Sequence, residues 1–202
     1  MKKLFAAIIV ISIIHGCSNT PKSPAEPTQE EKKDSTAKED TTATVKSYFP
    51  VKDYIRSDIT NAETYYTVFR KYITRGNKTD SSYINPDEFK KLAAEFTTDD
   101  LSKDALEKDY NETSFFDQTL GAYTFTYATT NSEPAVKRVD VVASPGDGYD
   151  KVRSIYIEKW GKNGNVSIVK KMYWKSEHNF QVILVVNTIP VKTETIKVVW
   201  NE

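Results

Sequence analysis

Side chains capable of nucleophilic or metal chemistry are scarce in this sequence. The 202-residue chain contains one cysteine, Cys17, and a single histidine beyond residue 16, His178. A structural zinc site uses about four Cys or His ligands, and a thiol enzyme needs a Cys paired with a His. The sequence therefore predicts no zinc centre, no thiol catalysis and no intrachain disulfide.

Carboxylates are the remaining groups that could act on a substrate or bind a cation. Asp99 and Asp100 could in principle do acid–base work, but they lie at an expected helix start, where capping is the ordinary role of such acids. Asp147 and Asp150 lie among glycines without the spacing of a calcium loop, so we interpret them as part of a polar turn. Neither Gly-x-Ser-x-Gly nor His-Glu-x-x-His occurs, and we predict no catalytic residue, metal site or cofactor.

Basic side chains gather in one segment. From Asp150 to Lys175 the chain holds seven Lys or Arg residues and two acids. This segment could contact lipid phosphates or lipopolysaccharide. The alternative is a solvated face, or one facing the stretch from Asp87 to Glu112, which holds nine acids and four lysines. Over the whole chain 28 basic residues balance 28 acidic ones, which gives no support for a nucleic-acid partner.

The N-terminus has the features of a secretion signal. Lys2 and Lys3 precede an uncharged run of 11 residues from Leu4 to Ile14. This run is too short to cross a bilayer, which takes about 20 helical residues, and it has the length of a signal-peptide core. The small residue Gly16 and then Cys17 follow it, so we expect residues 1–16 to be removed.

The stretch Ile14-His15-Gly16-Cys17 resembles the lipobox of bacterial lipoproteins. This resemblance implies cleavage between Gly16 and Cys17 and attachment of a diacylglyceryl group to the Cys17 thiol. Each buried acyl carbon contributes roughly 0.8 kcal/mol, so two or three chains anchor a protein almost permanently. The residue after the cysteine is Ser18 and not Asp, which in the enteric sorting rule resembles an outer-membrane lipoprotein. Residues 19–23 lack the acidic cluster that is typical of surface-export signals in Bacteroidota lipoproteins. We therefore expect a lipid-anchored protein of the bacterial cell envelope, in the outer membrane and facing the periplasm.

Residues 17–46 are predicted to be a lipidated cysteine and a disordered tether. Residues 18–46 contain three prolines, five lysines and six acids, and no aromatic residue. Such a segment cannot bury enough surface to offset its chain entropy, and a coil of this length reaches about 30 Å. Two short sequences resemble the O-glycosylation sequon of Bacteroidota and would place sugars on Ser35 and Thr41. An unmodified polar linker is the alternative.

Residues 47–202 are predicted to form a single α+β domain with two or three short helices. A first helix follows Pro50, because apolar residues recur at helical spacing: Val51, Tyr54, Ile55 and Ile59. Asn85 and Pro86 mark the start of a second helix, whose apolar stripe comprises Phe89, Leu92, Ala93 and Phe96. A short third helix is expected around residues 99–107.

The remaining patterns predict an antiparallel sheet. Alternation around a turn at residues 75–78 indicates an N-terminal β-hairpin between Tyr66 and Ile84, with a helix through Phe69 as the alternative. No later break is long enough for a crossover helix, so about six strands should form a curved antiparallel meander packed against the helices. The expected strands are Gly121–Thr129, Ala135–Ala143, Asp150–Trp160, Asn165–Lys175, Asn179–Asn187 and Val191–Trp200.

The stretch from Phe180 to Val186 is apolar on both faces of its expected strand. One face should pack the helices, and the other should be covered by sheet curvature, by the N-terminal hairpin, or by a ligand or partner. Trp160, Trp174 and Trp200 fall near strand ends, where they could close the core or rim a binding cavity, and we favour the core.

Six stretches of the domain carry a family resemblance: Tyr48-Phe49-Pro50, residues 113–118, residues 138–141, residues 149–152, residues 170–174 and Val198-Val199-Trp200. They resemble a group of small, uncharacterised lipoproteins of Bacteroidota. That resemblance implies no function or site. We expect a non-enzymatic envelope lipoprotein that binds a partner or assembles with other envelope components, and the alternative is a periplasmic carrier or sensor of a hydrophobic ligand.

The lipid anchor is tested by replacing Cys17 with serine. Serine offers no thiol for the thioether, so we expect the Cys17→Ser protein to leave the membrane fraction and to lose its label in cells fed a radioactive fatty acid. A Ser18→Ala variant is the matched control and should stay membrane-bound. Equal membrane association of the two variants would contradict the lipobox interpretation.

Overall fold

The computed structural model describes residues 48–146 and 152–201, which belong to one compact unit. Within these residues, nine strands form one sheet, and three α-helices and a 3-10 helix accompany them. The helices are α1 (Val51–Tyr65), α2 (Pro86–Ala93), η1 (Ala94–Thr97) and α3 (Lys103–Asp109). The strands are β1 (Phe69–Arg75), β2 (Lys78–Ile84), β3 (Asn111–Asp117), β4 (Ala122–Ala128), β5 (Val136–Ala143), β6 (Val152–Asn163), β7 (Val166–Lys175), β8 (Asn179–Val186) and β9 (Lys192–Val199).

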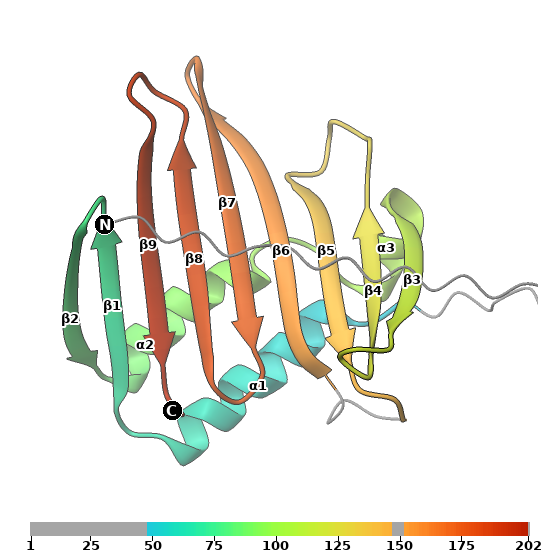
Figure 1. Cartoon of the computed structure of the whole chain (residues 1–202), viewed down its shortest axis with the longest axis horizontal. Coiled ribbons are helices and arrows are strands. Elements are labelled where there is room, and N and C mark those ends of the chain that lie inside the picture. The colour runs from blue at the N-terminus through green and yellow to red at the C-terminus, as the bar shows by residue number, and fades with distance from the viewer. Residues whose placement is uncertain (1–47, 147–151, 202) are drawn as a thin grey trace, which may run out of the picture. The chain divides into compact units, whose positions relative to one another are not determined.

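Every neighbouring pair in the sheet is antiparallel, and the order is β2-β1-β9-β8-β7-β6-β5-β4-β3 (Figure 1). The predicted hairpin is β1–β2, and it extends the meander because β1 pairs with the last strand, β9. The α+β class and the antiparallel sheet are therefore confirmed. The expected six-strand meander is one strand short, because β3 went unrecognised.

The edge strand β3 escaped prediction for a physical reason. Its sequence is NETSFFD, and five of its seven residues are exposed. An edge strand with little burial needs no alternation of apolar and polar residues, so it carries no period-2 signal. The neighbouring β4 buries Ala122 and Tyr127 and shows the pattern better.

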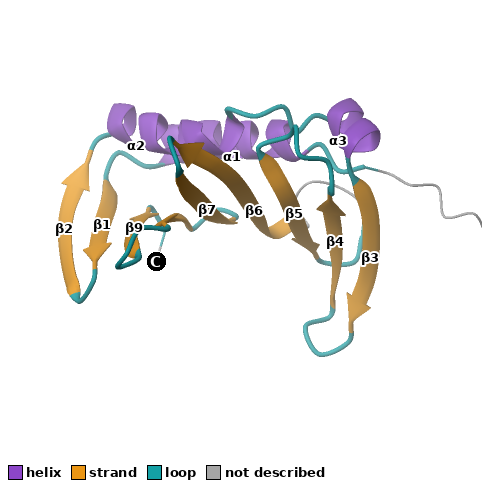
Figure 2. Ribbon diagram, turned by 90° about the horizontal axis from the view of Figure 1, so that it is seen from above, coloured by secondary structure: helices purple, strands orange, loops and turns teal. Residues whose placement is uncertain are grey.

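All the helices of the described residues lie on one face of the sheet (Figure 2). The predicted stripe of α1 is confirmed, since Val51, Tyr54, Ile55 and Ile59 are buried. The helix ends at Tyr65, so the alternative of a helix through Phe69 is wrong, and Phe69 begins β1. The second start is confirmed by Asn85, whose side chain accepts a hydrogen bond from the Glu88 N–H. The third helix begins later than expected, after its cap Ser102.

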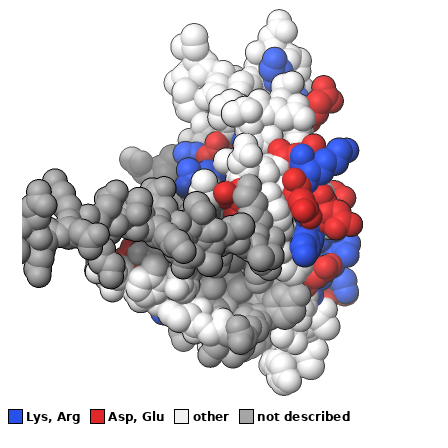
Figure 3. All heavy atoms as spheres, turned by 90° about the vertical axis from the view of Figure 1, so that its right-hand side faces the viewer, with Lys and Arg blue, Asp and Glu red and all other residues white. Residues whose placement is uncertain are grey.

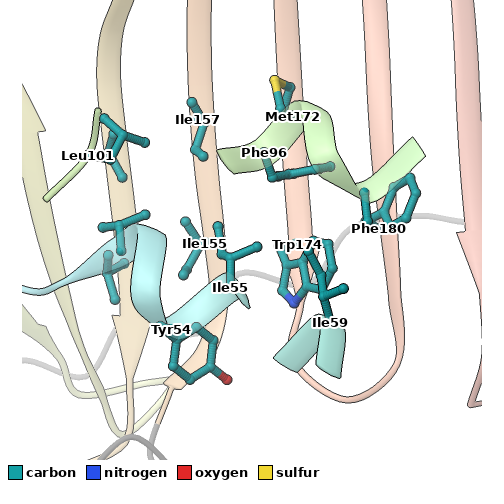
Figure 4. Packing of buried hydrophobic residues seen from close by; sticks show 14 of the residues in the cluster. Tyr54, Ile55, Ile59, Phe96, Leu101, Ile155, Ile157, Met172, Trp174 and Phe180 are labelled. Atoms are coloured by element: carbon teal, nitrogen blue, oxygen red, sulfur yellow. The ribbon is translucent and has the colours of Figure 1, made fainter. Parts of the chain in front are cut away.

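Aromatic rings hold the helices to the middle of the sheet (Figure 4). The Trp174 and Phe180 rings stack with centroids 5.5 Å apart, and Phe96 from η1 meets both edge-on at 5.1 Å and 5.3 Å. Nearby, Phe69 of β1 stacks on Phe89 of α2 at 4.1 Å. Such pairs contribute about 0.5–1.5 kcal/mol each beyond the area they bury. These rings connect β1, β7 and β8 to α2 and η1.

The three tryptophans do not share one environment. Trp174 and Trp200 are buried, as expected for core residues, but Trp160 is 55% exposed. Side chains alternate along β6, so Ile157 and Lys159 face the helices, whereas Trp160 faces the opposite side. The core interpretation was therefore wrong for Trp160.

A buried carboxylate ties α1 to the turn between β7 and β8. Asp58 is 5% exposed and accepts hydrogen bonds from the Trp174 Nε1–H at 2.6 Å and from the Glu177 N–H at 3.2 Å. Glu177 has a φ of 61°, in the left-handed region, so this contact stabilises a turn conformation that non-glycine residues seldom adopt. Tyr54 adds a 2.7 Å bond to the Ser176 hydroxyl in the same turn.

Asp58 gives a pH-dependent prediction. Burial raises the pKa of Asp58 above its ordinary value, so the folded protein keeps this proton to a higher pH than the unfolded chain does. The stabilisation from protonated Asp58 is complete below the unfolded pKa and is lost as the pH rises through the folded pKa. Asp58→Asn removes the charge and keeps an acceptor oxygen. We expect the Tm of this variant, relative to the Tm of wild type at the same pH, to increase as the pH rises from about 4 to 7.

Circular dichroism melts at several pH values measure this difference, and Asp58→Ala is the companion variant. Alanine leaves the Trp174 Nε1–H without an acceptor, which costs about 1–3 kcal/mol. Melting curves of Asp58→Asn and wild type that stay parallel over the whole pH range would contradict the account of this contact.

Candidate functional site

The sheet face opposite the helices is the candidate site, because no helix of the described residues covers it (Figure 2). Along β8, Phe180 and Val182 pack against the core on the helix side, so Gln181 and Ile183 point to the other side. We call this second side the open face. Figure 2 shows the β1–β2 and β3–β4 hairpins extending away from the helices at the two ends of the sheet.

The open face contains a hollow of about 450 Å³ over adjacent strands β7, β8, β9, β1 and β2. Its lining combines ammonium, imidazole, amide and hydroxyl groups, with Val199 as the single aliphatic side chain among the described residues there. We call it the polar hollow. Its lining residues are Tyr72, Thr74, Thr79, Lys175, His178, Asn179, Gln181, Thr195, Lys197, Val199 and Asn201.

The positive charges of the polar hollow are not neutralised within the described part of the chain. Lys175 and Lys197 line the hollow, and no described lining residue is Asp or Glu. Within residues 48–146 and 152–201, neither lysine takes part in a salt bridge. The hollow therefore presents a positive potential to solvent.

Arg70 adds a third cation beside the polar hollow. Its guanidinium lies 5.2 Å from the centroid of the Tyr72 ring and 5.9 Å from that of Tyr83. Such cation–π contacts hold the side chain while leaving its positive charge in place. Arg70 pairs with Val199 across the β1–β9 ladder, and Tyr72 with Lys197, so Arg70 and Lys197 are diagonal neighbours on one face.

Cations on the helix face behave differently. Lys159 lies 3.1 Å from a Glu95 oxygen and 2.5 Å from an Asp99 oxygen, and Lys170 lies 2.9 Å from the same Glu95 oxygen. Burial by itself would raise the pKa of Glu95, but the hydrogen bonds from Lys170 and Lys159 outweigh it and lower the pKa. For these two lysines the structure selects the alternative in which the basic segment faces the acidic helical region.

The other end of the open face carries charges that are already paired. Arg138 donates to both carboxylate oxygens of Asp140 at 3.0 Å and 2.9 Å. Glu158 accepts from Tyr156 at 2.8 Å and from the Trp160 Nε1–H at 2.6 Å. Burial alone would raise the pKa of Glu158, but these two hydrogen bonds outweigh it and lower the pKa. The carboxylates of Asp140 and Glu158 thus have partners within the sheet, whereas the lysines of the polar hollow have none among the described residues.

Charge also alternates in sign at the β3 end of the domain. Figure 3 faces this end and shows Lys and Arg interspersed with Asp and Glu along one side. Helix α3, with the sequence KDALEKD, contributes both signs. A surface of mixed charge offers a charged ligand no extended field of one sign, unlike the lining of the polar hollow.

An apolar groove of about 220 Å³ lies on the helix face, where β8 and β9 extend past α2 and η1. Its lining includes Glu95 and Lys170, and its apolar members are Leu92, Phe180, Val182, Leu184 and Ile196. Farther along β8, Val186 is half-buried. The helices therefore cover only part of the apolar residues of β8.

The sequence-predicted site residues have different outcomes. His178 lies in the predicted turn, its Nδ1 is 2.8 Å from the Ser176 carbonyl oxygen, and it lines the polar hollow. Asp99 contacts Lys159, whereas Asp100 accepts from the Ser102 N–H, so the two acids do not converge. Among the described residues no group of His, Cys, Asp and Glu could hold a metal ion. Gly16, Cys17, Ser35, Thr41, Asp147 and Asp150 lie outside the described residues.

Sequence reasoning did not single out Arg70 or Lys197. The alternation in β9, KTETIKVV, would have placed Thr195 and Lys197 on one face. The pairing of β9 with β1, which brings Lys197 beside Arg70, has no local signal in the sequence.

No family model, curated protein or solved structure matches the chain. Among the described residues no helix has the length and apolar character needed to cross a membrane.

The contrast between paired and unpaired lysines gives a stability prediction. Lys159→Gln removes charged hydrogen bonds to Glu95 and Asp99 from a mostly buried position, so we expect it to lower the free energy of unfolding by about 1.5–3 kcal/mol. Lys197→Gln removes a cation that has no ion pair among the described residues, and it should change that free energy by less than about 0.5 kcal/mol. Urea denaturation measures both. Equal losses in the two variants would contradict the distinction between the paired Lys159 and the unpaired Lys197.

Proposed function

We propose that this protein is a lipid-anchored, non-enzymatic component of the bacterial cell envelope that binds another envelope component on its open face. The observation that carries the proposal is the polar hollow, in which Lys175 and Lys197 lie on an uncovered sheet without acidic neighbours among its described lining. Positive charges that share one face without acidic partners give that face electrostatic complementarity to an anionic ligand.

The anchor and the location belong to the proposal and rest on the sequence alone. The lipobox-like Gly16-Cys17 pair would provide the membrane attachment, and residues 18–46 would give the domain a reach of about 30 Å from the headgroups. We place the protein in the outer membrane, facing the periplasm, as a relative of the uncharacterised Bacteroidota lipoproteins that its sequence resembles.

The proposed role is binding because of the groups that the hollow offers. Its described residues provide ammonium, amide and hydroxyl groups, all of which hold polar ligands by hydrogen bonds. The imidazole of His178 is accompanied by neither a carboxylate nor a thiol in the described lining, so the hollow lacks the pairing that nucleophilic catalysis uses.

A carrier of a hydrophobic ligand is the second candidate function. The apolar groove beside Leu92, Val182 and Ile196 is the observation that favours it. Its volume of about 220 Å³ is below the roughly 300–1,000 Å³ of typical small-molecule sites. The open face therefore remains our preferred binding surface.

Photo-crosslinking in the bacterial host tests the proposed function. A photoreactive amino acid is placed at Tyr173 or Gln181 on the open face, and at Glu107 on α3 as the control position. If an envelope component occupies the open face, both open-face positions should give the same crosslinked product, and Glu107 should not. Identical product patterns at all three positions, or products from Glu107 alone, would overturn the assignment.

A further inference from the structure

We propose that the polar hollow binds an acidic carbohydrate, that is, a glycan chain carrying carboxylate or phosphate groups. The inference rests on the proposed function and names the kind of envelope component that the open face would hold.

The cations surround the hollow instead of forming one cluster. Lys175, Asn179, Val199 and Arg70 are successive partners across β7, β8, β9 and β1. Adjacent strands lie about 4.8 Å apart, so the backbones of Lys175 and Arg70 are separated by about 14 Å. Lys197 lies two residues before Val199 on the same face of β9. This spacing suits several anionic groups on one extended ligand better than a single small anion.

Amide and hydroxyl side chains fill the space between the cations. Asn179, Gln181 and Asn201 each carry both donors and acceptors, and Thr195 adds a hydroxyl. Sugar hydroxyls donate and accept in the same way, so this lining can satisfy a ligand rich in hydroxyl groups. A ligand made only of phosphates would leave the amide oxygens without donors.

Tyrosine rings lie at the two ends of a second row of partners across the same four strands. Tyr173, Gln181, Lys197 and Tyr72 are successive partners across β7, β8, β9 and β1, and Tyr173 is 41% exposed. A tyrosine presents a flat apolar ring with a polar tip, which can lie against a sugar ring while its hydroxyl hydrogen-bonds. The row therefore offers two rings with an amide and an ammonium group between them.

The lining argues against the other anionic partners. Val199 is the single aliphatic side chain among the described lining residues, so acyl chains and the apolar side chains of an acidic peptide would find little area to bury. We therefore favour a glycan over a lipid headgroup with its acyl chains or an acidic protein.

Titration calorimetry on the full chain carrying Cys17→Ser tests the proposal. The probes are oligogalacturonate, which carries carboxylates, and phosphorylated dextran, with neutral dextran and polyglutamate as comparisons. We expect at least one acidic glycan to bind at least tenfold tighter than either comparison, and the affinity to fall as salt is raised. The double variant Lys175→Gln/Lys197→Gln should weaken this binding at least tenfold.

A matched double variant, Lys108→Gln/Lys162→Gln, removes two positive charges at exposed positions outside the polar hollow and should retain the affinity within twofold. The proposal is overturned if neither acidic glycan binds, if both double variants weaken binding equally, or if polyglutamate binds as tightly as the glycans. In the last case an open-face partner would still exist but would be an acidic protein. Open-face crosslinks to a protein together with no glycan binding would likewise reject the glycan and leave the proposed function standing.

Discussion

A nine-stranded sheet has two faces, and in the described part of this chain the helices cover only one of them (Figure 2). The aromatic stack of Phe96, Trp174 and Phe180 fixes that layer over β7 and β8. Strands farther from it are less buried, and six of the seven residues of the edge strand β2 are exposed. The open face must remain compatible with water, which accounts for the Lys, Thr, Asn and Gln residues along it.

The same constraint divides the charged residues into two groups. On the helix face, Lys159 is mostly buried and Lys170 is partly exposed, and both are paired with Glu95. On the open face, water can solvate Lys175 and Lys197, so the fold does not require acidic partners for them. The fold therefore leaves the charge of the open face available for a ligand, whereas the charges of the helix face are paired within the domain. This difference links the fold to the proposed function.

Local signals predicted the parts of the fold that depend on local chemistry. The Asn85 cap, the apolar stripe of α1 and the turns between later strands were all predictable, because each depends on a few adjacent residues. The edge strand β3 lacked such a signal, and Trp160 was misassigned because the facing of β6 residues depends on the register of the sheet.

The candidate site could not be predicted for the same reason. His178 and Lys175 were visible as turn and basic residues, and the consecutive strands β7, β8 and β9 bring Lys197 near them. Arg70 comes from the opposite end of the domain sequence, and only the β1–β9 pairing places it beside Lys197. Long-range pairing depends on the whole arrangement of strands and has no short sequence motif.

Lysine acylation footprinting tests the central claim, that the open face is occupied in the cell envelope. Intact cells and the purified protein are treated with the same lysine-reactive reagent, and labelling is quantified by mass spectrometry, with Lys162 as the exposed reference on the β6–β7 hairpin. The account predicts that Lys175 and Lys197 are protected in the envelope relative to the purified protein, whereas Lys162 is labelled equally in both. Equal labelling of all three lysines in the two samples would contradict it.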